Sequence, residues 1–166
     1  MKDIVLRSVL DLRATEETDS PHADAVASLI LRAGVWTTPV CIERETGAVM
    51  DGHHRLAAAH RLGLQMIPVV SLTYDQVELR AWRDGFEVSP TEIMRRALAG
   101  DLYPPKTTRH LFAEALPPCL VPLARLRLEQ EFGRHMDWVW NGEGTPNVQV
   151  PGARYGVAER RLRTAA

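Results

Sequence analysis

The chain has 166 residues, of which 45% are hydrophobic and 25% are charged, and its formal net charge is −1. This length and composition indicate a soluble globular protein of one domain, or of one domain with a small addition. The near-neutral charge provides no general attraction to nucleic acid or to an anionic membrane, so either partner would need a local basic patch. Neither a signal peptide nor a membrane-spanning stretch is evident, which predicts a cytoplasmic protein. Cys41 and Cys119 lie in apolar stretches and are predicted to be buried thiols rather than a disulfide.

Short apolar segments of β type alternate along the chain with amphipathic helical segments, a pattern typical of a mixed α/β (α+β) fold. Strands are predicted at residues 4–12, 39–43, 48–50 and 67–72. Helices are predicted at residues 21–32, 52–62, 74–83 and 90–98. Pro68 favours an edge position for the last of these strands, because proline cannot donate a backbone hydrogen bond to a neighbour. We expect residues 1–75 to form the core domain and residues 76–166 a mostly helical and loop-containing C-terminal portion.

A polar motif, Asp51-Gly52-His53-His54-Arg55, separates the predicted strand at 48–50 from the helix that follows it. This order predicts a strand, a tight turn and a helix start, with a cationic cluster in the first helical turn. Because the first backbone N–H groups of a helix are unpaired and its dipole is positive there, the motif favours phosphate binding. Two other interpretations remain open. One is a zinc site through the histidines, although no cysteine and no HExxH spacing supports it. The other is an ordinary helix start with Asp51 as a cap.

Two further polar clusters flank this motif at a distance in the sequence. Glu16, Glu17 and Asp19 precede the first predicted helix, where carboxylates also complement the positive end of the helix dipole. The second cluster is the run Lys106-Thr107-Thr108-Arg109-His110. All five of its side chains can donate hydrogen bonds to phosphate or carboxylate oxygens, but such a run also suits a solvated surface. Composition alone therefore leaves the roles of both clusters open.

The polar motif and the order of the elements around it resemble the ParB/sulfiredoxin-like superfamily. Within that superfamily the sequence most resembles the free L-serine kinases, both ADP-dependent and ATP-dependent. The resemblance covers residues 4–75 and extends more loosely to 104–110. Sulfiredoxins carry a catalytic cysteine where His53 stands, so their reductase chemistry is not expected. ParB partition proteins bind CTP and continue into a helix-turn-helix, and no basic recognition helix is evident in this sequence.

The resemblance to serine kinases implies a role for each cluster. Glu16 takes the place of the catalytic base, with Glu17 as the alternative if the alignment slips by one residue. Asp51 is implied to act in catalysis beside the Mg²⁺ or the transferred phosphoryl group. The residues implied to bind the nucleotide phosphates are Gly52, His53, His54 and Arg55. The residues implied to bind the substrate are Lys106, Thr107, Thr108, Arg109 and His110. Trp82 is a candidate wall of the substrate pocket, although a core position is the more ordinary interpretation of a tryptophan.

The resemblance therefore implies a kinase that uses ATP or ADP with Mg²⁺ to phosphorylate the hydroxyl group of a free amino acid. L-Serine is the expected substrate and O-phospho-L-serine the product, while the shortness of the chain leaves the identity of the amino acid open. Nucleic acid is not an expected partner. One alternative is a ParB-like regulator that binds CTP or ATP, or a DNA-binding protein, without kinase activity; binding of CTP in preference to ATP and ADP would favour it. Another alternative is a non-catalytic interaction module. The sequence leaves the phosphate donor and the oligomeric state undecided.

Overall fold

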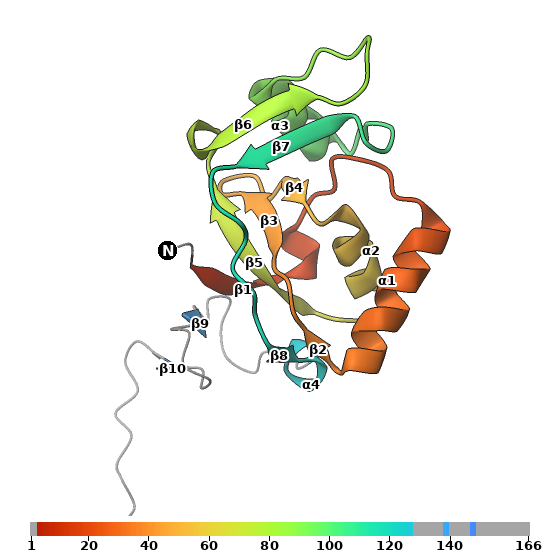
Figure 1. Cartoon of the computed structure of the whole chain (residues 1–166), viewed down its shortest axis with the longest axis vertical. Helices are drawn as coiled ribbons and strands as arrows, with labels where there is room; N and C mark the ends of the chain where they lie inside the picture. The colour runs from red at the N-terminus through yellow and green to blue at the C-terminus, as the bar shows by residue number, and fades with distance from the viewer. Residues whose placement is uncertain (1–2, 128–137, 140–146, 149–166) are drawn as a thin grey trace, which may run out of the picture.

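The structure is a computed structural model that describes residues 3–127, 138–139 and 147–148. Its central element is a four-stranded sheet with the strand order β1-β5-β3-β4 (Figure 1). The four strands are β1 (Ile4–Ser8), β3 (Val40–Glu43), β4 (Val49–Asp51) and β5 (Met66–Leu72). β5 runs parallel to β3 and antiparallel to β1, and β4 runs antiparallel to β3.

The other elements surround this sheet. The helices are α1 (Ser20–Ala33), α2 (His53–Arg61), α3 (Pro90–Ala99) and α4 (Leu123–Leu126), with short 3-10 turns η1 (Val9–Asp11) and η2 (Tyr74–Gln76). The remaining strands are β2 (Val35–Trp36), β6 (Val77–Ala81), β7 (Thr108–Phe112), β8 (Val121–Pro122), β9 (Trp138–Val139) and β10 (Asn147–Val148). They pair as β2 with β8, β6 with β7, and β9 with β10. No helix in the described part of the chain is long and apolar enough to cross a membrane.

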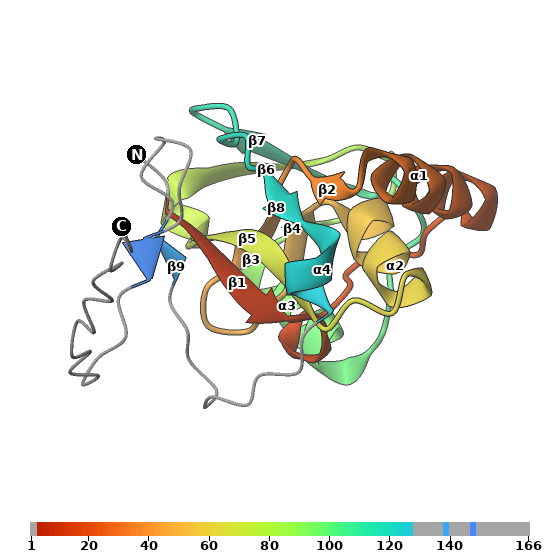
Figure 2. The ribbon, with the colours of Figure 1, turned by 90° about the horizontal axis from the view of Figure 1, so that it is seen from below.

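The core surrounds the sheet and includes side chains of α2 and α4, while α1 packs against α2 on the side away from the sheet (Figures 1 and 2). The central strands β3 and β5 supply continuous apolar runs, as expected of strands that are covered on both faces. Val40, Cys41 and Ile42 are at most 2% exposed. Cys41 and Cys119 are both buried and neither is in a disulfide, which confirms their predicted state.

Pro68 does not lie on an edge strand, so this prediction from the sequence is wrong. β5 pairs with β1 on one side and with β3 on the other, and Pro68 stands opposite Leu6 of β1. The ladder between β3 and β5 begins one residue later, at Val40 and Val69. At Pro68, therefore, β5 has a strand neighbour on only one side, which is where a proline can be tolerated.

The predicted helix at residues 74–83 is also wrong. The chain makes one 3-10 turn there and then forms β6, which pairs antiparallel with β7 from Val77 opposite Phe112 to Ala81 opposite Thr108. This ribbon and α3 lie above the four-stranded sheet in the view of Figure 1. The C-terminal portion is therefore less helical than expected. Apart from β9 and β10, its residues beyond 127 lie outside the described part.

Candidate functional site

The turn between β4 and α2 leaves a helix end with unpaired donors. Gly52 is the N-cap residue, with a φ of 101°, and no side chain in the described part of the protein caps this end. The first hydrogen bond of the helix runs from the Leu56 N–H to the Gly52 carbonyl over 2.9 Å. The N–H groups of residues 53–55 therefore precede the helical ladder and can face an anion. The N-termini of α1 and α3 differ, because a side chain caps each of them. Asp19 accepts a hydrogen bond from the His22 N–H in α1, and Ser89 accepts one from the Glu92 N–H in α3.

Arg55 fixes this turn to the strand beside it. Its Nη2 pairs with Oδ2 of Asp51 at 2.8 Å, and its Nη1 donates to the carbonyl of Thr38 at 3.1 Å and to that of Pro39. A Cβ atom on Gly52 would lie only 3.1 Å from the Arg55 guanidinium. Asp51 is therefore an ion-pair partner of Arg55 and not the helix cap considered from the sequence, and much of the positive charge of Arg55 is already balanced.

His53 is packed against the loop that precedes α1. Its Nε2 lies 2.8 Å from the Thr15 hydroxyl, which in turn donates to the Val49 carbonyl at 3.0 Å. Burial lowers the pKa of His53 to about 4, with the nearby carboxylate of Glu16 opposing that shift. At neutral pH the imidazole is uncharged, and it links the β4–α2 turn to the loop of residues 13–19.

His54 is half-buried on the other side of the helix start. Its ring meets His22 of α1 edge-on, with 4.4 Å between the ring centroids. Burial and the neighbouring His22 lower the pKa of His54. The cationic cluster predicted from the sequence is therefore wrong in its charge: neither histidine is mainly protonated at neutral pH. What this turn offers an anion is chiefly its backbone N–H groups.

Glu16 is a buried carboxylate with four hydrogen bonds. Its Oε1 accepts from the N–H of Thr107 at 3.1 Å, and from the N–H and hydroxyl of Thr108 at 2.6 Å each. Its Oε2 accepts from the N–H of Lys106 at 2.9 Å. The side chain is only 9% exposed. Glu17, the alternative to Glu16, is exposed, and its N–H is bound to the Tyr103 carbonyl at 2.9 Å.

The run from Lys106 to His110 does not form a single cluster, because it passes from a turn into β7. Thr107 is buried and donates its hydroxyl hydrogen to the Pro104 carbonyl at 2.8 Å. Lys106 is exposed and has a φ of 59°, which keeps its amide turned towards Glu16. These two residues therefore shape the turn that surrounds the carboxylate.

The side chains of β7 alternate between its two faces. Thr108 donates a hydrogen bond to Glu16. His110 lies against Tyr74, with 3.3 Å between the His110 Nε2 and the Tyr74 hydroxyl. Arg109 lies between them in sequence and instead places its guanidinium 4.7 Å from the ring centre of Trp82. Trp82 is 56% exposed, so the alternative of a core tryptophan is wrong. Burial and the nearby His53 lower the pKa of His110 to about 4, so it too is neutral at pH 7.

A resident metal centre has little support. No group of three or more histidine, cysteine or acidic residues in the described part is arranged to hold an ion, which disfavours zinc. Mg²⁺ is held differently, by one or two carboxylates together with water and phosphate oxygens. Asp51, with its side chain 48% exposed beside the unpaired N–H groups, fits that arrangement.

Sequence reasoning did not find Thr15 or Tyr103. Thr15 links Glu16's loop to His53, and Tyr103 forms a β-bridge with Glu16. The sequence signals that could have pointed to them were their positions, because Thr15 precedes Glu16 and Tyr103 precedes Pro104. A hollow of about 400 Å³ lies elsewhere, at the start of β6 and the end of β7, and none of the predicted site residues lines it. The candidate site is thus a junction of three segments, residues 13–19, 51–55 and 103–110.

Comparison with curated proteins gives two distant relatives, while no family model matches the chain. A ParB-like protein of Sulfolobus acidocaldarius is 36% identical over 70 residues, covering 37% of this chain and 35% of that protein. The ADP-dependent L-serine kinase SerK of Thermococcus kodakarensis is 25% identical over 100 residues, covering 57% of this chain and 41% of the kinase. The matched region thus spans less than half the length of either relative.

Solved structures show the same fold. A free serine kinase in complex with AMP superposes with a TM-score of 0.68 at 16% identity, covering 75% of this chain and 94% of that chain. SbnI from Staphylococcus aureus, with a C-terminal truncation, gives a TM-score of 0.67 at 15% identity, covering 78% and 90%. The chain is a distant relative of the ParB-like proteins and of the free serine kinases. The mixed α/β fold expected from the sequence resemblance is thereby confirmed.

Proposed function

We propose that this chain is a kinase that phosphorylates the hydroxyl group of a free amino acid, with L-serine as substrate and ATP or ADP as phosphate donor. One observation carries the proposal: the buried Glu16 carboxylate lies at the junction of residues 13–19, 51–55 and 103–110, beside the uncapped start of α2. Phosphoryl transfer to an alcohol needs a proton acceptor and a site for phosphate oxygens. This junction supplies both.

The phosphate oxygens would be bound by the N–H groups at the start of α2. Because His53 and His54 are neutral at pH 7, the attraction would come from these donors and from the positive end of the helix dipole. Lys106 supplies an exposed positive charge close enough to His54 to contribute to lowering its pKa. The distant relatives support nucleotide binding as such, since one is named an ADP-dependent kinase and free serine kinases have been solved with AMP and with ADP.

The hydroxyl proton would be accepted by Oε2 of Glu16. A carboxylate oxygen accepts about two hydrogen bonds. Oε1 already accepts three, whereas Oε2 accepts one, from the Lys106 N–H. Oε2 is therefore the oxygen with capacity left for a substrate hydroxyl, and the turn around it fixes the direction from which that hydroxyl would approach.

Asp51 would hold Mg²⁺, which when bound with the nucleotide neutralises charge on the phosphates. The ion pair with Arg55 keeps the Asp51 carboxylate at the helix start. We further assign the roles implied for the substrate-binding residues. His110 would contact the substrate, because it shares with Thr108 the face of β7 that meets Glu16. Arg109 and Trp82 contact each other on the opposite face, so we assign them no role at the Glu16 carboxylate.

The test is the formation of O-phospho-L-serine from L-serine with ATP and with ADP, in the wild type and in Glu16→Gln. The amide of glutamine cannot accept all the hydrogen bonds of the carboxylate, so this variant also loses stability, about 1–3 kcal/mol for each N–H left unpaired. Thermal unfolding must therefore accompany the assay. Glu17→Gln is the matched control, because it removes the same charge from an exposed neighbour.

We expect Glu16→Gln, assayed below its unfolding temperature, to lose at least about a hundredfold in kcat, in the range of general base catalysis. Glu17→Gln should stay within about twofold of the wild type. If the wild type turns over no hydroxy amino acid with either nucleotide, the kinase proposal is wrong. If Glu16→Gln is as active as the wild type, Glu16 is not the base.

The second candidate is a ParB-like nucleotide-binding regulator, which the 36% identity to a ParB-like protein favours. Binding of CTP in preference to ATP and ADP, together with no turnover of hydroxy amino acids, would support it. Preference for ATP or ADP would argue against it.

A further inference from the structure

Tyr103 holds the backbone on both sides of Glu16. The N–H of Tyr103 donates to the Thr15 carbonyl at 2.9 Å, and the N–H of Glu17 donates to the Tyr103 carbonyl at 2.9 Å. The two residues flanking Glu16 are thus bound to one residue of another segment. A shift of Tyr103 would therefore strain both hydrogen bonds and, through them, the backbone that carries the Glu16 carboxylate.

The ring of Tyr103 is held by its faces and not by its hydroxyl. It is 2% exposed, and its hydroxyl oxygen has no hydrogen-bond partner within the described residues. Phe86 meets the ring nearly edge-on, with 6.3 Å between centroids. The guanidinium carbon of Arg96 lies 4.1 Å from the ring centre, a cation–π distance. Arg96 is therefore the charged group that holds this ring.

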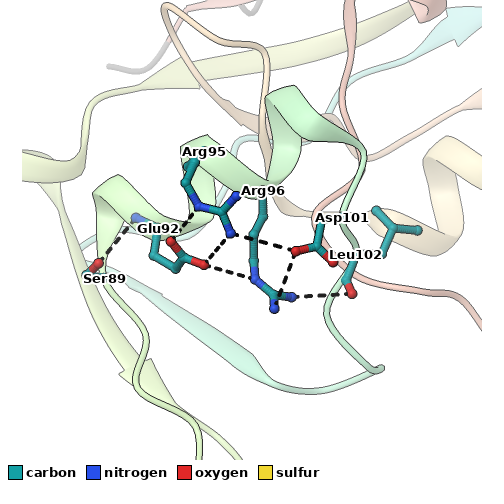
Figure 3. A network of polar contacts seen from close by, with 6 residues as sticks. All are labelled: Ser89, Glu92, Arg95, Arg96, Asp101 and Leu102. Atoms are coloured by element: carbon teal, nitrogen blue, oxygen red, sulfur yellow. Dashed lines mark hydrogen bonds and ion pairs between the residues drawn. The ribbon is translucent and has the colours of Figure 1, made fainter.

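Arg96 is itself held in place by a network on α3 (Figure 3). Its Nε pairs with Glu92 at 3.1 Å, and its Nη2 lies 3.5 Å from Asp101. Its Nη1 reaches the Leu102 carbonyl at 3.5 Å. Contacts on both sides of the guanidinium fix its position against the Tyr103 ring, as a single ion pair at the surface would not.

We propose that Arg96 is a positioning residue for the carboxylate at the candidate site: it fixes Tyr103, and Tyr103 fixes the strand-like backbone of Glu16. The inference rests on the proposed function for its effect on catalysis, but its structural part can be tested without any turnover. Arg96 does not touch the substrate in this proposal. It acts through the ring and the two backbone hydrogen bonds.

Arg95 provides a matched control on the same helix. It pairs with the same Glu92 at 2.8 Å and lies 3.7 Å from the same Asp101. Its side chain is 57% exposed, whereas that of Arg96 is 23% exposed, and its guanidinium is not the one over the Tyr103 ring. Arg95→Met and Arg96→Met therefore remove the same charge from the same ion-pair network, but only the second removes the contacts with the Tyr103 ring and with the Leu102 carbonyl. Tyr103→Leu, described below, separates the ring from the Leu102 contact.

The first measurement is amide hydrogen exchange by NMR in both methionine variants. In Arg96→Met we expect the amides of Tyr103 and Glu17 to exchange about tenfold faster than in the wild type, because their hydrogen bonds open more often. In Arg95→Met they should stay within about twofold. The amide of Leu56 in α2 is the internal reference and should not change in either variant.

A second variant keeps the test valid if Arg96→Met disturbs α3. Tyr103→Leu retains Arg96 and its ion pairs but removes the ring, and it should expose the Glu17 amide in the same way. Tyr103→Phe, which removes only the unpartnered hydroxyl, should leave that amide protected. Unchanged protection in Arg96→Met, or an equal loss in Arg95→Met, would overturn the proposal.

The second measurement is catalytic. We expect Arg96→Met to lower kcat for phosphoserine formation about tenfold with little change in the KM for the nucleotide, because the start of α2 is left intact. Arg96→Lys, which keeps a cation near the ring, should restore part of that loss. Equal changes in kcat and in the nucleotide KM would contradict a positioning role. Absence of turnover in the wild type would refute the proposed function, while the exchange result would still decide the role of Arg96.

Discussion

Replacing Gly52 by alanine tests whether the close packing at the start of α2 is as tight as the structure indicates. Gly52 has a φ of 101°, a conformation that L side chains rarely adopt, and this costs alanine about 1–2 kcal/mol. The added Cβ would also lie 3.1 Å from Cγ2 of Val40 and from the guanidinium of Arg55, which is held by its own partners. Such crowding adds about 1–2 kcal/mol. The total is a loss of about 2–4 kcal/mol.

Gly63, at the other end of the same helix, is the matched control. Its φ is 62°, so alanine is strained there too, but an added Cβ would have no neighbour within 4 Å. Urea unfolding should therefore show that Gly52→Ala destabilises the protein by about 1–2 kcal/mol more than Gly63→Ala. In a Val40→Ala background this excess should shrink, because the two sites are coupled. Equal losses in the two glycine variants would show that the packing argument is wrong.

Two predictions concern the loss of folding stability at acid pH. Burial raises the pKa of Glu43, but the hydrogen bonds from Thr46 and its neighbours outweigh it, so the folded-state pKa is lowered. Glu43 therefore stabilises the fold above the unfolded-state pKa of about 4.3, and this stabilisation is lost as the pH falls through the folded value. Urea unfolding from pH 7 to pH 3 should show a smaller acid loss for Glu43→Gln, and an identical loss would count against these hydrogen bonds. Burial lowers the pKa of His53 and His110 to about 4, so stability should fall from about pH 6.5 to about pH 4 as the unfolded chain binds protons. Imidazole NMR signals from these two residues that titrate near pH 6.5 would refute their burial.

Local sequence signals correctly predicted those elements in which the hydrophobic pattern of the segment agrees with its packing in the fold. The strand, turn and helix around Gly52 follow from an apolar pair, a glycine and a run of helix formers. α3 was predicted with its cap, Ser89, because a capping residue followed by proline is a strong helix start. In each of these cases the information lies within about ten residues of chain.

Where distant pairing decides the structure, the sequence was misleading. Residues 77–81 have helix-forming neighbours, but pairing with β7 makes them a strand, and no local signal reveals that partner. The interpretation of Glu16 shows the same limit. Acidic residues before a helix suggest interaction with its dipole, whereas Glu16 turns away to bind a segment about 90 residues later. The charge of His53 and His54 could not be predicted either, because burial decides it.

The sequence separation of the Glu16 contacts also bears on how the site forms during folding. Its partners at Lys106, Thr107 and Thr108 are 90 to 92 residues away, so a large loop must close before any of these hydrogen bonds exists. The four-stranded sheet is complete by residue 72 and needs none of them. A nascent chain can therefore build its scaffold first, while the carboxylate acquires its hydrogen-bond donors only after the β6–β7 ribbon docks. The Glu16 carboxylate therefore has its full set of hydrogen-bond donors only once the chain has folded as far as residue 108.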